Sequence, residues 1–181
     1  MTRAFQSKVA TAGLGLMACL AGCGSGTLGP DNAPSGSVLT PAVVSASYQS
    51  AGGGYGPVPP SGAACDPGKW TYLITMATHD VSWNGCSVNG PESDPTSYVA
   101  ATVDHPLDAS TWAAVHSALA NVTISSAPGC GADKDQQSLT VQTNSDAITY
   151  GDDFYACQKQ YDAYVATARL DALYAELSQL L

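Results

Sequence analysis

Four cysteines constrain the fold of this chain more than any other feature. Cys65, Cys86, Cys130 and Cys157 are spread through the C-terminal part of a 181-residue sequence. No two of them lie within four residues of each other, whereas zinc sites normally take their cysteines in close pairs. An even number of separated cysteines in an exported domain predicts two disulfides. A four-cysteine zinc site is the alternative, and the choice depends on whether the chain is exported.

The first 22 residues have the composition of a secretory signal peptide. Arg3 and Lys8 carry the only charges, and an uncharged stretch rich in Gly and Ala follows them. A basic start, a short apolar core and small residues at its end are typical of such a signal. The apolar stretch is too short to span a bilayer stably. The start of the chain therefore predicts export.

The end of this segment, Leu20-Ala21-Gly22-Cys23, resembles the lipobox of bacterial lipoproteins at all four positions. The resemblance implies that residues 1–22 are removed and that Cys23 becomes the lipid-attachment residue. Acyl chains contribute about 0.8 kcal/mol per buried methylene, so several chains hold a protein on a membrane. Gly24 after the cysteine implies the outer membrane of the cell envelope, where the cell has two membranes. The alternative is an ordinary signal peptide with Cys23 as an incidental thiol.

Residues 23–63 are predicted to be the lipidated cysteine and a flexible tether. Gly, Pro and Ser fill 22 of the 40 positions from 24 to 63, and Asp31 is the only charge. Such a composition buries too little apolar surface to offset the entropy of ordering the chain. Residues 37–48 are more apolar, and a transient strand or a partner contact is the alternative there.

Residues 64–181 are predicted to form one compact domain. Alternating apolar residues indicate strands, a 3.6-residue apolar period indicates helices, and the element order is β-β-β-α-β-β-α. Strand blocks separated by helices favour an α+β fold: an antiparallel sheet of about five strands, stapled by disulfides, with two helices packed on one face. The expected strands are 69–76, 81–88, 98–107, 138–143 and 147–150, and the expected helices are 108–122 and 152–181.

Four cysteines permit three disulfide pairings. We favour Cys65–Cys86, which joins the start of the domain to its second strand, and Cys130–Cys157, which joins a long loop to the final helix. Each bridge closes a loop of a few tens of residues and is expected to contribute about 3 kcal/mol.

The charge of the chain argues against nucleic-acid binding. The formal charge is −9, and it becomes −11 when Arg3 and Lys8 leave with the signal. Nucleic-acid-binding proteins need clustered basic residues to neutralise phosphates. Anionic lipid headgroups would also repel this domain, so that its link to the membrane is expected to be the lipid on Cys23.

No sequence motif of a known catalytic site is present. The three histidines are His79 in a predicted turn, His105 before a proline and His116 on a predicted helix. The sequence has no G-x-S-x-G elbow and no H-E-x-x-H metal motif. We therefore expect no catalytic residue, no cofactor and no established metal site.

Acidic residues offer one further possibility, a calcium site. Asp133, Asp135, Asp152 and Asp153 would approach one another if Cys130 and Cys157 are bonded, and clustered carboxylates are the ligands that calcium prefers. The alternative, which we favour, is that Asp133 and Asp135 are solvated and that Asp152 or Asp153 caps a helix.

These observations predict a membrane-anchored lipoprotein whose domain is a non-catalytic binding or envelope-structural module. Its partner would be an envelope protein or a glycan. A cell-envelope hydrolase and a protein inhibitor that presents the 89–97 loop are the alternatives. The segment 129–157 also resembles uncharacterised secreted or lipid-anchored proteins of high-GC bacteria, and this similarity implies no activity.

Overall fold

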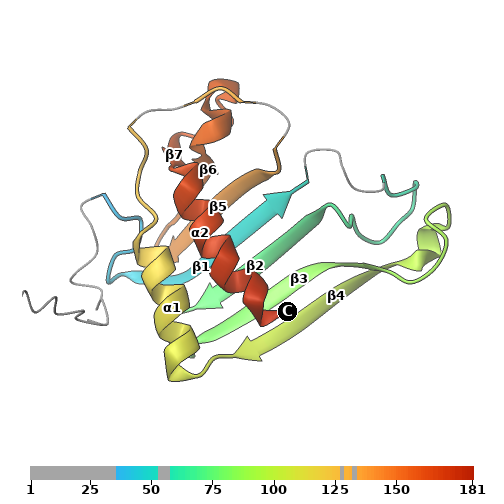
Figure 1. Cartoon of the computed structure of the whole chain (residues 1–181), viewed down its shortest axis with the longest axis horizontal. Helices are drawn as coiled ribbons and strands as arrows, with labels where there is room; N and C mark the ends of the chain where they lie inside the picture. The colour runs from blue at the N-terminus through green and yellow to red at the C-terminus, as the bar shows by residue number, and fades with distance from the viewer. Residues whose placement is uncertain (1–35, 53–57, 127–128, 132–133) are drawn as a thin grey trace, which may run out of the picture.

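Seven strands form a single sheet in the part of the chain that the computed structural model describes, residues 36–52, 58–126, 129–131 and 134–181. The strand order is β4-β3-β2-β1-β5-β6-β7 (Figure 1). All neighbouring strands are antiparallel except β6 and β7, which are parallel. The fold is therefore α+β as predicted, but the sheet is mixed and has seven strands rather than about five. The strands are β1 (Val43–Ala51), β2 (Lys69–Thr75), β3 (Asp80–Val88), β4 (Tyr98–Pro106), β5 (Gln136–Thr143), β6 (Ala147–Asp152) and β7 (Ala163–Val165).

The strands β2, β3 and β4 form an antiparallel meander, as the sequence predicts. Branched and aromatic residues alternate along β2, so that Tyr72 and Ile74 are buried on one face. The turn into β3 places His79 at a φ of 56°, a left-handed conformation that few non-glycine residues adopt. Tyr72 is paired with Trp83 across the ladder, so both side chains lie on the same face of the sheet.

The strand β1 lies at the centre of the sheet and corrects the predicted boundary of the tether. It pairs with β2 on one side and with β5 on the other, although its residues fall within the range 23–63. Ala46, Tyr48 and Ser50 alternate toward the buried face. The small and polar residues of this segment concealed the period of a strand, and its pairing with two neighbours supplies the stability that its composition lacks. The folded domain therefore includes residues before 64.

The helix α1 (Ala109–Ala120) follows β4 as predicted. The Asp108 side chain accepts a hydrogen bond of 2.8 Å from the Thr111 N–H, which satisfies a free donor at the helix start. The backbone bond from Thr111, with bonds from the Ser110 and Thr111 side chains, lowers the pKa of Asp108 to about 2. Val115 and Leu119 on one stripe of the helix are fully buried.

The C-terminal segment is not the single helix that the sequence predicts over residues 152–181. It forms a 3-10 turn η3 (Asp153–Gln158), the strand β7 and the helix α2 (Thr167–Leu177), which a second 3-10 turn η4 (Ser178–Leu180) extends. Lys159 adopts a φ of 53° and ends η3. The Gly151–Tyr164 pairing then joins the segment to β6, so that sheet pairing overrides the local helix preference.

The core cluster draws buried residues from the strands and from both α1 and α2, which are labelled in Figure 1. Tyr174 of α2 stacks on Tyr48 of β1, with ring centroids 5.7 Å apart and an interplanar angle of 14°. Its ring also contacts Trp70 and Tyr72 of β2. Burial raises the pKa of Tyr72 to about 12, and Tyr174 adds to this effect. These aromatic contacts fix α2 over β1 and β2.

Two disulfides are present with the predicted pairing. Cys65 is bonded to Cys86 with a Cα–Cα distance of 5.5 Å, and Cys130 is bonded to Cys157 with a Cα–Cα distance of 5.1 Å. Both distances lie within the usual range for a disulfide. The first bridge ties the segment before β2 to β3, and the second ties the segment before β5 to η3.

The predicted signal peptide and Cys23 lie outside the described residues. Within the described ranges, no helix is long and apolar enough to cross a membrane.

Candidate functional site

Two of the three histidines, His79 and His116, lie against Trp112 of α1. The His79 ring stacks on Trp112 with centroids 4.4 Å apart and an interplanar angle of 15°. The His116 ring lies 5.5 Å from the same indole. Burial lowers the pKa of His116, and the nearby His79 lowers it further. Burial and the neighbouring imidazole, rather than a paired acid, therefore set the direction in which the pKa of His116 shifts.

His105 lies on β4, and its Nε2 is buried without a hydrogen-bond partner. Among the described residues, no hydrogen bond or ion pair joins a histidine to a carboxylate. A hydrolytic triad needs a base oriented by an acid. The same part of the chain holds no group of three His, Cys, Asp or Glu residues that could bind a metal ion.

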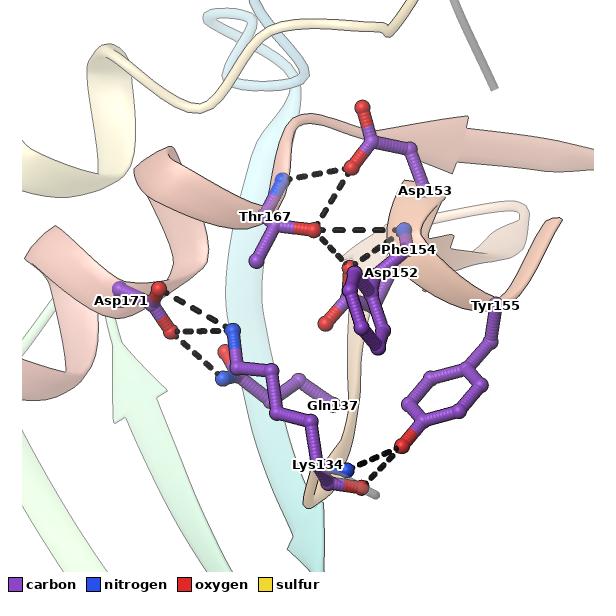
Figure 2. A network of polar contacts seen from close by, with 8 residues as sticks. All are labelled: Lys134, Gln137, Asp152, Asp153, Phe154, Tyr155, Thr167 and Asp171. Carbon is purple, nitrogen blue, oxygen red and sulfur yellow. Dashed lines mark hydrogen bonds and ion pairs between the residues drawn. The ribbon is translucent and has the colours of Figure 1, made fainter. Parts of the chain in front are cut away.

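The acidic residues considered as calcium ligands have other partners (Figure 2). Asp152 accepts hydrogen bonds from the Phe154 N–H, at 2.9 Å, and from the Thr167 hydroxyl. Asp153 accepts from the Thr167 N–H at 2.9 Å, from the Thr167 hydroxyl at 2.7 Å and from the Ser125 hydroxyl at 2.6 Å. These bonds tie η3 to the first residue of α2.

The two carboxylates at this junction differ in their surroundings. Partial burial raises the pKa of Asp153, but bonds from Ser125 and Thr167 outweigh it, so its pKa is lowered overall. Asp152 is almost fully buried, and its Oδ2 has no partner. Asp135 also makes a contact of its own, and Asp133 lies outside the described residues. The described part of the cluster therefore acts as a junction between two elements.

Lys134 and Asp171 form the second part of the same network (Figure 2). The Lys134 ammonium lies 3.0 Å from the Asp171 carboxylate, which also accepts a 2.7 Å hydrogen bond from the Gln137 amide. The Tyr155 hydroxyl contacts the backbone of Lys134 on both its N–H and its C=O sides. The network therefore joins β5, η3 and α2 at one end of the molecule.

At the opposite end, β3 and β4 project from the sheet beyond α2 as a two-stranded arm that carries the 89–97 loop at its tip (Figure 1). We call residues 84–103 the arm. The Cys65–Cys86 disulfide ties this arm to the segment before β2. Val99 is 46% exposed, and Val103, four residues further along β4, is 41% exposed. The arm thus presents apolar side chains where no helix covers the sheet.

The 89–97 loop is held by its own hydrogen bonds. The Asn89 N–H donates to the Ser97 C=O at 2.9 Å, and the Tyr98 hydroxyl donates to the Glu92 C=O at 2.9 Å. Asp94 accepts from the Thr96 N–H at 2.9 Å and caps the short turn η2 (Pro95–Ser97). Bonds from Thr96 lower the pKa of Asp94. The loop is therefore ordered although it is exposed.

A shallow hollow of about 260 Å³ lies at the base of the arm. Cys65, Asp66, Lys69, Trp70 and Asn84 are among the residues that line it. Of these lining residues, Lys69 and Asp66 form an ion pair at 3.3 Å. The Nε1 of Trp70 is buried and lacks a partner. None of the three histidines lines this hollow.

The sequence placed β4 as a strand, but its position at an edge of the sheet was missed. Edge position depends on strand order, and strand order depends on the central β1, which the sequence analysis assigned to the tether. The lack of charge from Tyr98 to Val103 was the signal available for an exposed, pairing-competent strand.

Comparison with protein-family models, with curated proteins and with solved structures finds no match to this chain.

Proposed function

We propose that this chain is a lipid-anchored protein of the bacterial cell envelope whose domain binds a partner through the arm. The observation that carries the proposal is the arm itself, a disulfide-tied projection with exposed Val99 and Val103 and an ordered loop at its tip. Exposed apolar residues at an uncovered part of a fold are typical of interaction surfaces.

Three features favour binding over catalysis at this surface. First, we infer that α1 and α2 together cover one face of the sheet and leave the arm without a helix over it. The loop is ordered by internal bonds, so binding costs little further ordering entropy. The disulfide holds the arm to the body of the domain, so that a force from a bound partner on the loop passes to the sheet.

The proposed location, on a membrane of the cell envelope, rests on the lipobox resemblance at Cys23. Acylation there would anchor the domain to the membrane and leave the arm to act outside the cytoplasm, where disulfides persist. The test is membrane fractionation of cells that produce the full chain. Cys23→Ser is expected to release the protein from membranes, and Cys19→Ser is expected to leave it there. Release by Cys19→Ser rather than by Cys23→Ser would overturn the proposed membrane location.

The binding role is tested by photo-crosslinking in the same cells. A photoreactive residue replaces Glu92 at the tip of the arm or, as a matched control, Asn144 in the β5–β6 turn, since both positions are exposed hairpin residues. Adducts are expected from position 92 and not from position 144. Equal adducts from both positions, or none from position 92, would contradict binding through the arm.

A protein inhibitor is the second candidate, and the hydrogen-bonded 89–97 loop favours it. Inhibitors gain affinity when a protruding loop is already held in its bound shape. Here the Glu92 C=O and the Asp94 side chain are both fixed by hydrogen bonds. If the position-92 adduct is an enzyme whose activity falls on binding, the inhibitor role is supported; a non-enzymatic adduct supports the structural role.

A further inference from the structure

Within the part of the chain that the structure describes, the two edges of the sheet differ, and only one of them is long and open. β7 spans three residues, and Ile124 forms a further bridge to its Val165. β4 spans nine residues and pairs with β3 alone. We infer that β4 pairs antiparallel with β4 of a second copy of this chain, so that two sheets join into one. This inference goes beyond the proposed function, because it concerns the open edge of β4 rather than the 89–97 loop.

The direction of the backbone groups along β4 follows from the ladder with β3. The Leu107 N–H donates to the His79 C=O at 3.1 Å, and the Asn89 N–H donates to the Ser97 C=O. Hydrogen-bonded and non-hydrogen-bonded pairs alternate along an antiparallel ladder. Odd-numbered residues of β4 therefore bond to β3, and the N–H and C=O groups of Ala100, Thr102 and Asp104 point away from the sheet.

In one antiparallel register, the outward N–H and C=O groups of one copy face the C=O and N–H groups of the second copy. With the two-fold axis at Ala101, Ala100 of one copy faces Thr102 of the other, and each such pair exchanges two backbone hydrogen bonds. On the face that carries the exposed valines, Val99 then faces Val103 of the second copy. Each pair covers two side chains that are 46% and 41% exposed in one chain.

The distribution of charge along β4 also favours a second copy of this chain as the partner. The run from Tyr98 to Val103 carries no charge and no proline, the devices that usually protect an edge strand. Asp104 lies three residues from the axis, so the two copies of Asp104 stand about 20 Å apart along the strands. That separation exceeds the Debye length of about 8 Å at physiological ionic strength. The acidic charge of the whole domain makes the pairing stronger as salt concentration rises.

The pairing is tested by disulfide formation at the axis. Ala101 on the axis would form a non-hydrogen-bonded pair with itself, with Cα atoms about 4.5 Å apart, a distance that a disulfide spans. Full-length Ala101→Cys, in isolated membranes under mild oxidation, is expected to give a covalent dimer on a non-reducing gel. Asn144→Cys and the wild-type chain give the background.

A second change separates pairing from accidental collision. Ala100→Pro removes one outward N–H without touching the ladder to β3, and edge strands tolerate proline at such positions. The Ala100→Pro/Ala101→Cys chain is expected to lose the covalent dimer, and Ala100→Ser/Ala101→Cys is expected to keep it. Circular dichroism checks that each variant is folded.

The outcomes distinguish this inference from the proposed function. If position 92 gives adducts but Ala101→Cys gives no dimer above background, the self-pairing is wrong and the binding role stands. If the dimer survives Ala100→Pro in a folded chain, the register is wrong and the inference is overturned. A dimer at Ala101 without adducts at position 92 supports self-pairing and refutes binding by the loop.

Discussion

Removing the Cys65–Cys86 disulfide is predicted to lower the free energy of unfolding by about 3.3 kcal/mol at 25 °C. The perturbation is Cys65→Ser/Cys86→Ser in the full chain. The bridge closes a loop with a sequence separation of 21, and chain-entropy theory relates the stabilisation to the logarithm of that length. Both cysteines are only partly buried, so the serines add little cost in the folded state.

The Cys130–Cys157 bridge supplies the matched control. Its sequence separation is 27, which gives about 3.5 kcal/mol by the same relation. The two double variants are therefore expected to lose nearly equal stability, with a difference of about 0.2 kcal/mol. Because small domains are stable by about 5–15 kcal/mol, each variant is expected to stay folded at room temperature.

The assay is equilibrium unfolding in guanidinium chloride, followed by circular dichroism and by tryptophan fluorescence. Trp70 and Trp83 lie near the first bridge, on strands β2 and β3. Coincident transitions by the two probes would show that unfolding is two-state. Losses that differ by more than about 1 kcal/mol between the two variants would refute the reasoning, because folded-state contacts would then outweigh the entropy of the unfolded chain.

Three further changes probe other parts of the molecule. Thr167→Val removes the hydroxyl that donates to Asp152 and Asp153 and is expected to cost about 2 kcal/mol in chemical unfolding; Thr167→Ser should retain most of the stability. Because the pKa of Asp153 is lowered in the folded state, part of that cost should vanish as pH falls through its folded pKa, and a constant cost would contradict this. The lowered pKa of His116 means that the folded state resists its protonation, so His116 should reduce stability as pH falls below about 6.5; thermal unfolding of His116→Gln should show a smaller loss over that range. Gly85→Ala would place a Cβ 2.1 Å from the Trp83 ring, and we expect a loss of about 1–3 kcal/mol with a shifted tryptophan emission; an unchanged spectrum would show that the ring does not lie over Gly85.

Local patterns sufficed for the elements between residues 65 and 152. Alternation identified β2 to β6, and the spacing of Val115 and Leu119 identified α1. The disulfides followed from the even count of cysteines and from their place beside the expected elements. These features are recorded in short stretches of sequence, where the period of apolar residues reports which face is buried.

Two elements could not be predicted because non-local pairing creates them. β1 alternates Ala46, Tyr48 and Ser50 toward the core. Residues 37–48 stood out as more apolar, but a strand was only the alternative there, because the surrounding segment is rich in Gly, Pro and Ser. β7 lies in a segment whose apolar spacing also suits a helix, and it becomes a strand only through its parallel pairing with β6. The arm was predictable as two strands, but its exposure depends on where α2 ends.

The central position of β1 has a consequence for the order in which the chain folds. Tyr48 is paired with Tyr72, 24 residues on, and with Leu139, 91 residues on. Contacts this distant in sequence slow folding, because the loop between them must close before the ladder forms. Until β5 has been made, β1 keeps one unpaired edge, and the second half of the sheet has no strand to pair with it. A chain that must cross a membrane before it folds would gain time from this arrangement.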